Sequence, residues 1–413
     1  MYTAKSGTFK RHAKKNAFSK QRSNTHRPER GQGCYKKSVG RKPYGRMQHT
    51  FNPSQFINTN PVEYTEDVYT PVHTFETFGL SENIVRNLTS LGLTVPTPIQ
   101  DQTIPHIMKG TDITGLAETG TGKTAAFLVP LIHQTLENPK KHTLILAPTR
   151  ELVLQIAEEL RTLSRGMKIF HTTCVGGMNI RPQIAGLRRT NHFVIATPGR
   201  MLDLIRRKHY RPEQATAVVL DEADRMLDMG FIADIRSILS LTPKDRETLL
   251  FSATMNAKTK EIVNDFLRNP VTVSVKKKDA ANSIEQDVVR YGHNKFDTLL
   301  TLLKTPACTR VIIFGSMKHS VEKLSQELKS HGIKAESIHG NKNHNQRQKA
   351  LSSFKQGTAH VLVATDVAAR GIHVDNVSHV INYDLPSTFE DYIHRIGRTG
   401  RGNKRGKALT FIA

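Results

Sequence analysis

Between Phe75 and Val275 the chain alternates short apolar runs with segments of helical periodicity. Segments such as Glu151–Leu163 and Met201–Arg206 repeat their apolar positions as one face of a helix does. The clearest runs, which are apolar or β-branched throughout, are Thr143–Ala147, Phe193–Ala196, Ala217–Leu220 and Thr248–Phe251. Strands of this kind between helices indicate a parallel sheet that is covered on both faces. We therefore predict a doubly wound parallel α/β domain over residues 71–275.

A second unit of the same kind follows a polar segment. Residues 276–283 have no hydrophobic period, which is typical of an interdomain linker. Beyond it the alternation resumes, and the clearest apolar runs are Val311–Phe314, Val361–Ala364, His379–Asn382 and Lys407–Ile412. We predict a second doubly wound domain over residues 284–413. Since no G-x-G-x-x-G opens either domain, neither is expected to be a Rossmann dinucleotide site.

Residues 1–70 have almost no apolar periodicity and are rich in Lys, Arg, Ser, Asn, Gly and Pro. Such a segment cannot bury enough surface to offset its ordering entropy, so we predict that it is disordered. Residues 1–60 hold 14 Lys and Arg against one acid, Glu29. A basic arm of this kind would add salt-dependent, nonspecific affinity for phosphates. A solvated tail without a partner and an organellar transit peptide are the alternatives.

The charge of the whole chain points to a polyanionic partner. Its 413 residues include 60 Lys and Arg against 36 Asp and Glu, a net charge of +24. Cys34, Cys174 and Cys308 lie far apart, so the sequence offers neither a disulfide framework nor a zinc site. We find no apolar run of membrane-spanning length and no signal-peptide core. We expect a cytoplasmic monomer without a membrane partner.

The segment Ala117–Thr124 reads Ala-Glu-Thr-Gly-Thr-Gly-Lys-Thr and lies between an apolar run and an apolar helical segment. A strand, a glycine-bearing loop, Lys-Thr and a helix in this order are typical of a phosphate-binding loop. Gly120 and Gly122 let backbone N–H groups close on phosphate oxygens at the positive end of the helix. Lys123 can reach the β- and γ-phosphates, and the Thr124 hydroxyl can hold Mg²⁺. A glycine-rich turn without a ligand is the alternative.

Acidic residues follow the predicted strand Ala217–Leu220 in the order Asp-Glu-Ala-Asp. In proteins with such a phosphate loop, an acid at the carboxyl end of a parallel strand meets the Mg²⁺ that the loop holds. We assign Asp221 to the metal, through water, and Glu222 to orienting or deprotonating the attacking water. A solvated acidic loop is the alternative, which the position after a buried strand of the same domain disfavours.

Further short motifs accompany these two in a fixed order. They are Pro96–Gln100 (PTPIQ), Pro148–Leu152 (PTREL), Gly176–Gly177, Thr197–Arg200 (TPGR), Ser252–Thr254 (SAT), Thr365–Gly371 (TDVAARG) and His394–Arg401 (HRIGRTGR). With them the chain, from Phe75 onward, resembles the DEAD-box family of ATP-dependent RNA helicases. The wording of His339–Lys342 is most similar to the bacterial RhlE-type subgroup. The resemblance implies two RecA-like domains, ATP and Mg²⁺ as cofactors, and RNA as the partner.

For the nucleotide, the resemblance implies contacts from both domains. Gln100 would read the adenine edge with its amide, although a helix-capping role fits the same residue. Arg398 and Arg401, about one helical turn apart, would act as arginine fingers on the γ-phosphate, with a basic RNA-binding helix face as the alternative. The implied nucleotide-binding residues are Phe75, Gln100, Thr119, Gly120, Thr121, Gly122, Lys123, Thr124 and His373. The catalytic set is Lys123, Asp221, Glu222, Arg398 and Arg401, with Thr124 and Asp221 at the metal.

For RNA, the resemblance implies contacts with the sugar–phosphate backbone. The residues are Thr149, Arg150, Gly177, Thr197, Arg200, Arg347, Thr365 and Gly371. Guanidinium groups, hydroxyls and exposed backbone N–H groups suit phosphates, and Trp is absent, so we expect largely sequence-independent binding. The preference for RNA over DNA is implied by the resemblance alone. Its physical basis would be recognition of the 2′-OH. Ser252, Thr254 and His394 would couple hydrolysis to the partner strand; for the first two, an ordinary turn is the alternative.

Three positions depart from the family pattern. Leu93 stands where an aromatic residue usually stacks on adenine, and His344 stands where Gln is usual on the RNA side. His373 replaces an Asp that the family uses on the ATP ribose. Neutral histidine can still bond to a hydroxyl but brings no fixed charge, so nucleotide affinity is expected to be weaker. A tolerated variant is the alternative.

The sequence thus predicts an ATP-dependent RNA helicase that locally unwinds or remodels RNA duplexes. ATP and RNA would draw two domains together, and closure would complete the hydrolytic site and bend one strand. A non-catalytic RNA-binding or annealing protein is the first alternative, disfavoured by intact Lys123, Asp221 and Glu222. A processive DNA helicase is the second, disfavoured by the motif wording.

Overall fold

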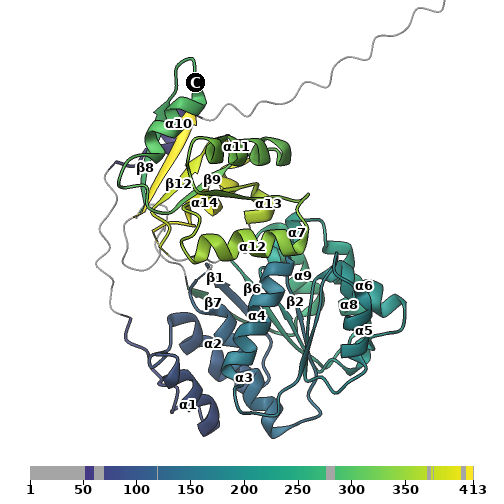
Figure 1. Cartoon of the computed structure of the whole chain (residues 1–413). Coiled ribbons are helices and arrows are strands. Elements are labelled where there is room, and N and C mark those ends of the chain that lie inside the picture. The colour runs from purple at the N-terminus through teal and green to yellow at the C-terminus, as the bar shows by residue number, and fades with distance from the viewer. Residues whose placement is uncertain are drawn as a thin grey trace, which may run out of the picture. The chain divides into compact units, whose positions relative to one another are not determined.

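The computed structural model describes residues 52–59, 69–118, 120–275, 284–369, 374, 376–400 and 406–412. The chain divides into Met1–His49 and Thr50–Ala413, and the described residues all belong to the second unit. This unit contains two parallel sheets with helices on both faces, as Figure 1 shows. Every helix within the described ranges is too short or too polar to span a lipid bilayer.

The strands of the first sheet all run parallel, and those between its two edge strands are largely buried. Strands that are consecutive in sequence are connected through helices, which return the chain to the same edge of the sheet. Among the described residues it has seven strands in the order β3–β4–β2–β5–β6–β1–β7. Their bounds are β1 (Ile113–Ala117), β2 (Thr143–Leu146), β3 (His171–Cys174), β4 (Phe193–Ala196), β5 (Ala217–Leu220), β6 (Glu247–Ser252) and β7 (Val271–Val275).

Alternate residues of these strands enter two hydrophobic layers. Ile145 and Val219 pack against the helices of one face, α1 (Glu82–Ser90), α2 (Pro98–Met108), α3 (Lys123–Glu137) and α4 (Arg150–Leu163). Leu144 and Val218 face the other layer. That layer is covered by α5 (Ile180–Leu187), α6 (Pro198–Arg206), α7 (Ala223–Asp228), α8 (Ile232–Leu241) and α9 (Ala257–Phe266), with the short 3₁₀ helix η2 (Pro212–Gln214) nearby. Figure 1 shows α3 and α4 on one side of this sheet and α5, α6 and α8 on the other.

The second sheet repeats the design in residues 285–412. In the described part of the chain its order is β10–β11–β9–β12–β13–β8, again all parallel. The strands are β8 (Glu285–Arg290), β9 (Val311–Phe314), β10 (Ala335–Ile338), β11 (Val361–Ala364), β12 (His379–Asn382) and β13 (Lys407–Ile412). Helices α10 (Lys295–Leu303) and α11 (Lys318–Ser330) pack on one face. On the other lie α12 (His344–Lys355), α13 (Asp366–Ala369) and α14 (Phe389–Ile396).

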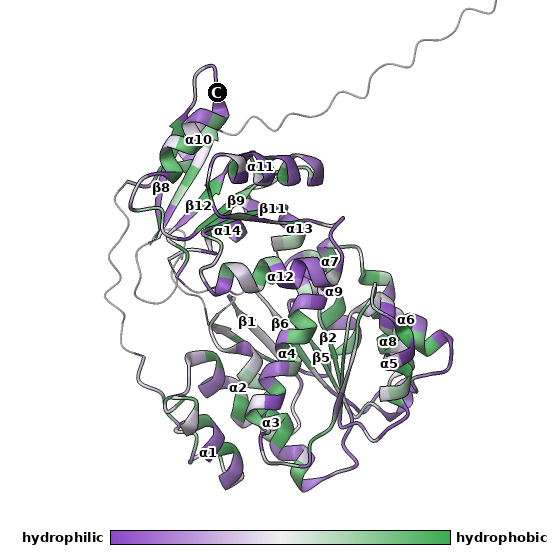
Figure 2. Ribbon diagram, viewed as in Figure 1, coloured by the Kyte–Doolittle hydropathy of each residue, from purple (hydrophilic) through white to green (hydrophobic). Residues whose placement is uncertain are grey.

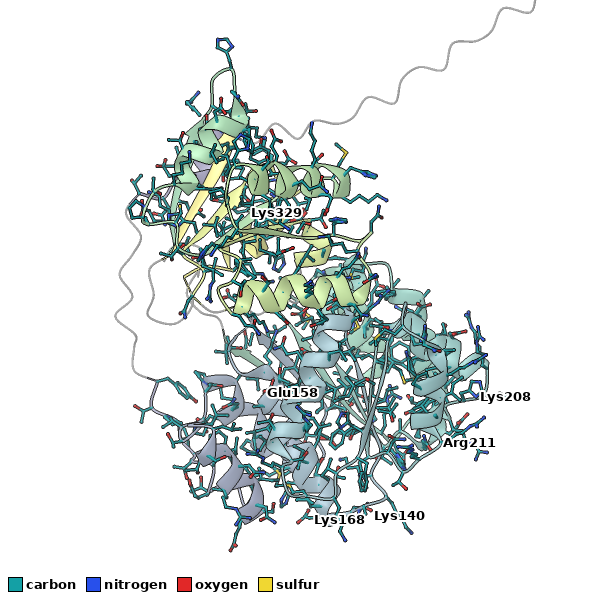
Figure 3. All side chains as sticks on the ribbon, viewed as in Figure 1. Lys140, Glu158, Lys168, Lys208, Arg211 and Lys329 are labelled. Atoms are coloured by element: carbon teal, nitrogen blue, oxygen red, sulfur yellow. The ribbon has the colours of Figure 1, made fainter. Side chains whose placement is uncertain are left out.

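The predicted pair of doubly wound parallel domains is confirmed. Figure 2 shows the hydrophobic pattern on which this prediction was based. Hydrophobic residues concentrate on the strands, while helices such as α11 and α12 carry many hydrophilic residues. The loops that lead into the strands of the first sheet lie at its amino edge. Charged side chains on these loops point outward, as Figure 3 shows for Lys140, Lys168, Lys208 and Arg211.

One part of the sequence prediction is wrong. Residues 52–59 belong to the segment expected to be disordered, yet they form the 3₁₀ helix η1 (Pro53–Phe56) and a β-bridge between Asn58 and Gln286. The physical reason is a single apolar anchor, Phe56, which is 1% exposed and offsets the cost of ordering its neighbours. The predicted linker 276–283 and the rest of the basic arm up to residue 51 lie outside the described residues.

Candidate nucleotide and RNA site

The predicted site residues of the first sheet gather at one edge. Because its strands are parallel, the loops that follow them all leave from the carboxyl edge, where ligands of such sheets bind. The predicted residues found there are Gly120 after β1, Thr149 after β2, Gly177 after β3, Thr197 after β4, Asp221 after β5 and Ser252 at the end of β6. Residues far apart in the sequence therefore line one surface.

The phosphate loop has the backbone that the sequence predicted. Gly120 and Gly122 have φ angles of +86° and +91°, in the left-handed region that favours glycine. The Lys123 ammonium is buried and donates to the Ala117 carbonyl at 2.8 Å, while the Thr121 hydroxyl donates to a carbonyl three residues earlier at 2.9 Å. The loop thus satisfies its own polar groups with bonds that phosphate oxygens can replace.

Gln100 connects this loop to the start of α2. Its Oε1 accepts from the Thr97 backbone N–H at 2.9 Å, and its Nε2 donates to the Gly122 carbonyl at 3.1 Å. The helix-capping role is therefore present in this structure, and the adenine contact stays a prediction. Phe75 is 2% exposed within the first core, which supports a packing role for this residue. Leu93 is 39% exposed, and its contact with a base stays a prediction.

Asp221 and Glu222 are buried next to each other with different proton affinities. Burial raises the pKa of Asp221 to about 6, although the charge of Lys123 opposes this. Burial also disfavours ionised Glu222, but the charges of Arg225 and Lys123 outweigh it and lower its pKa to about 2. Arg225 Nη1 donates to Glu222 Oε2 at 2.5 Å. Glu222 has φ 51° and ψ 52°, a left-handed conformation that costs energy in a non-glycine residue and is often found at functional sites.

The donors near the loop fit Mg²⁺. Thr124 lies in the first turn of α3, and its hydroxyl is a hard oxygen ligand, while the Asp221 carboxylate could hold the cation through water. No cluster of three or more His, Cys, Asp or Glu side chains in the described ranges could hold a metal by itself.

A further carboxyl group, which the sequence analysis missed, approaches the same donors. Glu159 of α4 lies near the Thr124 side chain. Burial and the nearby charge of Asp221 raise its pKa to about 7, which the interaction with Thr124 opposes. In the sequence it follows Glu158 on an amphipathic helix, which is typical of a solvated face. Glu158 does face solvent, paired with Arg161 (Figure 3).

Asp224 links the acidic motif to the loop after β6. Its Oδ2 accepts from the backbone N–H of Ala253 at 3.1 Å, and from the N–H and hydroxyl of Thr254 at 2.8 and 3.0 Å. The Ser252 hydroxyl accepts from the Asp224 N–H at 3.3 Å and donates to the Thr254 carbonyl at 2.8 Å. Ser252 and Thr254 are thus joined to the acidic motif, and Asp224 is a site residue that the sequence analysis did not single out.

Two predicted RNA contacts cap helices at the carboxyl edge. The Thr149 hydroxyl accepts from the Leu152 N–H at 3.2 Å at the start of α4, and Thr197 precedes α6. The Gly176 N–H donates to the Thr197 hydroxyl at 3.4 Å. Helix N-termini carry partial positive charge, so both caps lie where backbone phosphates are favoured.

Guanidinium groups lie beside these caps. Gly177 has a φ of +70°, in the left-handed region that favours glycine, and the Arg150 guanidinium lies where a Cβ would stand. Arg200 Nη1 donates to Gln183 Oε1 at 2.9 Å, and Gln183 also bonds to the backbone of Val175. Burial, together with repulsion from Arg347 and Arg200, lowers the pKa of Arg150. Clustered positive charges of this kind suit a polyanion. Gln183 orients the Arg200 guanidinium, and none of the sequence motifs includes Gln183.

The second sheet supplies the remaining predicted residues. Arg398 follows α14, is buried, and its charge also lowers the pKa of Glu222. His394 lies in the last turn of α14, and Thr365 follows β11. Arg347 of α12 forms an ion pair with Glu151 at 3.1 Å. Four predicted residues lie outside the described ranges: Thr119, Gly371, His373 and Arg401. The side chain of His344 is not described either.

Comparisons with known proteins agree with this geometry. Residues 97–262 match the family model for DEAD/DEAH box helicases, and residues 294–403 match that for the helicase conserved C-terminal domain. The chain is 46% identical over 342 residues to the DEAD-box ATP-dependent RNA helicase CshA of Bacillus licheniformis, covering 82% of this chain and 70% of that protein. It is 44% identical to the CshA of Bacillus subtilis, and the match covers 82% of this chain and 69% of that protein.

Solved structures give the same result. The S. cerevisiae protein Dbp5 bound to RNA and ADP BeF3 is 31% identical with a TM-score of 0.72, covering 82% of this chain and 89% of that one. Mss116p bound to ssRNA and AMP-PNP is 29% identical with a TM-score of 0.72, and the match covers 82% of this chain and 73% of that one. Both curated relatives are named CshA, so they lend no support to the predicted RhlE-type subgroup.

Proposed function

The chain belongs to the family of DEAD-box ATP-dependent RNA helicases. We propose that ATP and RNA bind at the carboxyl edges of its two sheets and that ATP hydrolysis requires residues from both sheets. The protein is an ATP-dependent RNA helicase with two RecA-like domains. One observation supports the proposal above all others. The phosphate loop, the buried pair Asp221 and Glu222, and the helix caps Thr149 and Thr197 share one sheet edge.

ATP binding would use bonds that the loop now makes with itself. Phosphate oxygens replace the Ala117 carbonyl as the acceptor for Lys123, and backbone N–H groups opened by Gly120 and Gly122 complete the cradle. Thr124 and Asp221 would hold Mg²⁺, which neutralises charge on the phosphates when bound. Thr119, Thr121, Gln100, Phe75 and His373 complete the proposed nucleotide set, with Phe75 acting through packing.

For hydrolysis, we assign Glu222 to the attacking water. Water adds to the γ-phosphorus while the bond to the β-phosphate oxygen breaks, giving ADP and phosphate. A carboxylate with a pKa of about 2 is a weak proton acceptor, so its surroundings favour the orienting role over deprotonation. Arg398 and Arg401 of the second domain would stabilise charge on the transferred phosphoryl group, which makes hydrolysis conditional on domain closure.

RNA would bind through its backbone at the same edges. Hydroxyls, guanidinium groups and helix N-termini recognise phosphates and sugars without reading bases. The proposed contacts are Thr149, Arg150, Gly177, Thr197, Arg200, Arg347, Thr365 and Gly371. Ser252, Thr254 and His394 would transmit the state of the nucleotide to the bound strand. A cytoplasmic monomer that acts without a membrane partner is part of the same proposal.

The test is RNA-stimulated ATP hydrolysis by the wild type and by Glu222→Gln. We expect RNA to raise turnover severalfold, and Glu222→Gln to lower kcat by about 100-fold or more while RNA affinity is kept. The exposed Glu213→Gln is the matched control and should behave as the wild type. Single-stranded DNA should stimulate less than RNA. RNA binding without measurable ATP turnover would favour the non-catalytic RNA-binding or annealing alternative, and equal stimulation by DNA would favour the DNA helicase.

A further inference from the structure

A short segment before the first domain docks on the second sheet. Asn52 caps the 3₁₀ helix η1, its side chain accepting from the Ser54 N–H at 3.1 Å. Asn58 then pairs antiparallel with Gln286: the Asn58 N–H donates to the Gln286 carbonyl at 2.7 Å, and the Gln286 N–H donates back at 3.0 Å. Since β8 is the last strand in the order of its sheet, this segment covers an edge whose backbone groups would otherwise lack partners there.

Phe56 anchors the segment. Its side chain is buried in a cluster with Ile284, Tyr392, Ile396 and Ala408. The ring meets Tyr392 edge-on, with centroids 4.7 Å apart and planes inclined by 60°. Burial of one such ring removes a large apolar surface from water, which stabilises the docked segment.

The surface that Phe56 covers belongs to the helix that leads to the proposed arginine finger. Tyr392 and Ile396 lie on α14, two residues before His394 and two before Arg398 respectively. The Tyr392 hydroxyl donates to Gln286 Oε1 at 2.9 Å, so the same strand residue binds both the segment and the helix. Phe56 therefore fixes α14 against β8 from one side.

Other contacts fix the opposite part of this helix. Arg395 is 2% exposed, and its Nε and Nη2 donate to the two carboxylate oxygens of Asp366 at 2.6 and 2.8 Å. Its Nη1 donates to the Asp384 carbonyl at 2.7 Å. These bonds hold α14 near β11 and β12, while the Phe56 cluster holds it near β8 and β13. The helix is thus clamped between two sets of contacts, one of which comes from outside its own domain in sequence.

We propose that Phe56 is a positioning residue for ATP hydrolysis, which acts through Tyr392 and Ile396 to set the orientation of α14 and hence of Arg398. The inference rests on the proposed role of Arg398. A rotation of α14 after loss of the ring would displace the guanidinium by a distance that matters for catalysis, because productive geometry tolerates errors of only about 0.5 Å. ATP and RNA binding by the first sheet would be unaffected, since its residues lie on other elements.

The test uses the full chain and four variants: Phe56→Ala, Phe56→Leu, Ile57→Ala and Arg398→Ala. We expect Phe56→Ala to lower the kcat of RNA-stimulated hydrolysis by about fivefold or more with little change in the KM for ATP. Phe56→Leu should recover most of the loss. Ile57, which is 49% exposed beside the anchor, is the matched control and should leave kcat unchanged.

A double-variant cycle separates positioning from general stability. If Phe56 acts through Arg398, adding Phe56→Ala to Arg398→Ala should lower kcat no further. A further fivefold loss in that background, or an unchanged kcat in Phe56→Ala alone, overturns the inference. Failure of the proposed function looks different, because Arg398→Ala itself would then retain wild-type turnover.

Discussion

Asp224 Oδ2 accepts two hydrogen bonds from Thr254, from the backbone N–H at 2.8 Å and from the hydroxyl at 3.0 Å. The acidic motif and the loop after β6 are therefore rigidly joined. Thr254→Val removes the hydroxyl bond but keeps the shape, a loss worth about 1 kcal/mol. We expect RNA-stimulated ATP turnover to stay within about threefold of the wild type, while the duplex opened per ATP falls about fivefold or more.

Strand displacement and phosphate release, measured in the same reaction, give this ratio directly. Thr242→Val is the matched control, because the buried Thr242 hydroxyl donates to the Leu239 carbonyl at 2.8 Å and lies on another loop. Equal losses of unwinding in both variants would mean that Thr254 has no special part in coupling.

Glu159→Gln tests the carboxyl group that approaches Thr124. The amide keeps the shape and an acceptor oxygen but removes a titratable charge near the Mg²⁺ donors. We expect the Mg²⁺ concentration for half-maximal ATP turnover to change about threefold or more, with RNA affinity preserved. Magnesium titrations of hydrolysis provide the measurement, and Glu158→Gln on the solvated side of α4 is the control. Identical magnesium curves for both variants would assign Glu159 to packing alone.

His373→Asp restores the carboxylate that the family pattern has at this position. The residue lies outside the described ranges, so the prediction rests on sequence alone. A carboxylate accepts a hydrogen bond from a ribose hydroxyl more strongly than neutral imidazole does. We expect the KM for ATP to fall by about threefold or more at neutral pH, measured by steady-state hydrolysis with saturating RNA. An unchanged or higher KM would rule out a ribose contact weakened by histidine.

Glu322 gives the second domain a distinct response to acid. Burial raises its pKa, but hydrogen bonds from Ser337 and His339 and the charge of Lys342 outweigh this and lower it to about 2. A carboxyl group with a lowered pKa stabilises the fold above its unfolded value near 4.5, and this contribution is lost as the pH falls toward about 2. Glu322→Gln should therefore be less stable than the wild type at pH 7, with the gap closing across that window.

Denaturant unfolding followed at several pH values measures this difference. The substitution Glu327→Gln on the same helix is the control and should follow the wild-type pH profile. A constant difference between Glu322→Gln and the wild type from neutral pH down to about pH 2 would show that the carboxylate charge is not responsible.

The strands that could be predicted were those with uniform apolar runs. β4 and β5 are buried at every position, so their composition alone identifies them. β3 (His-Thr-Thr-Cys) and β8 (Glu-Gln-Asp-Val-Val-Arg) lie at sheet edges, where one side is partly solvated and polar residues are tolerated. Their sequences resemble loops for this reason, and tertiary pairing alone makes them strands.

The candidate site divides in the same way. Residues in the loops that follow strands or at the start of the next helix, such as Asp221 and Lys123, belong to short motifs whose spacing reflects the local chain path. Glu159 and Gln183 sit on helices among ordinary polar residues, and their importance comes from what α4 and α5 face once packed. Phe56 lies in the segment that was predicted to be disordered, and the sequence does not reveal its packing because its partners are more than 200 residues away.

The separation of the two edges of the first sheet has a practical use. Lys140, Lys168, Lys208 and Arg211 lie on loops at the amino edge, whereas the proposed ligand contacts leave from the other edge (Figure 3). A cysteine introduced at Lys140 or Lys168 could carry a fluorophore or attach the enzyme to a glass surface without obstructing substrate. Single molecules could then be watched while they open RNA, with the dye reporting on motion instead of altering it.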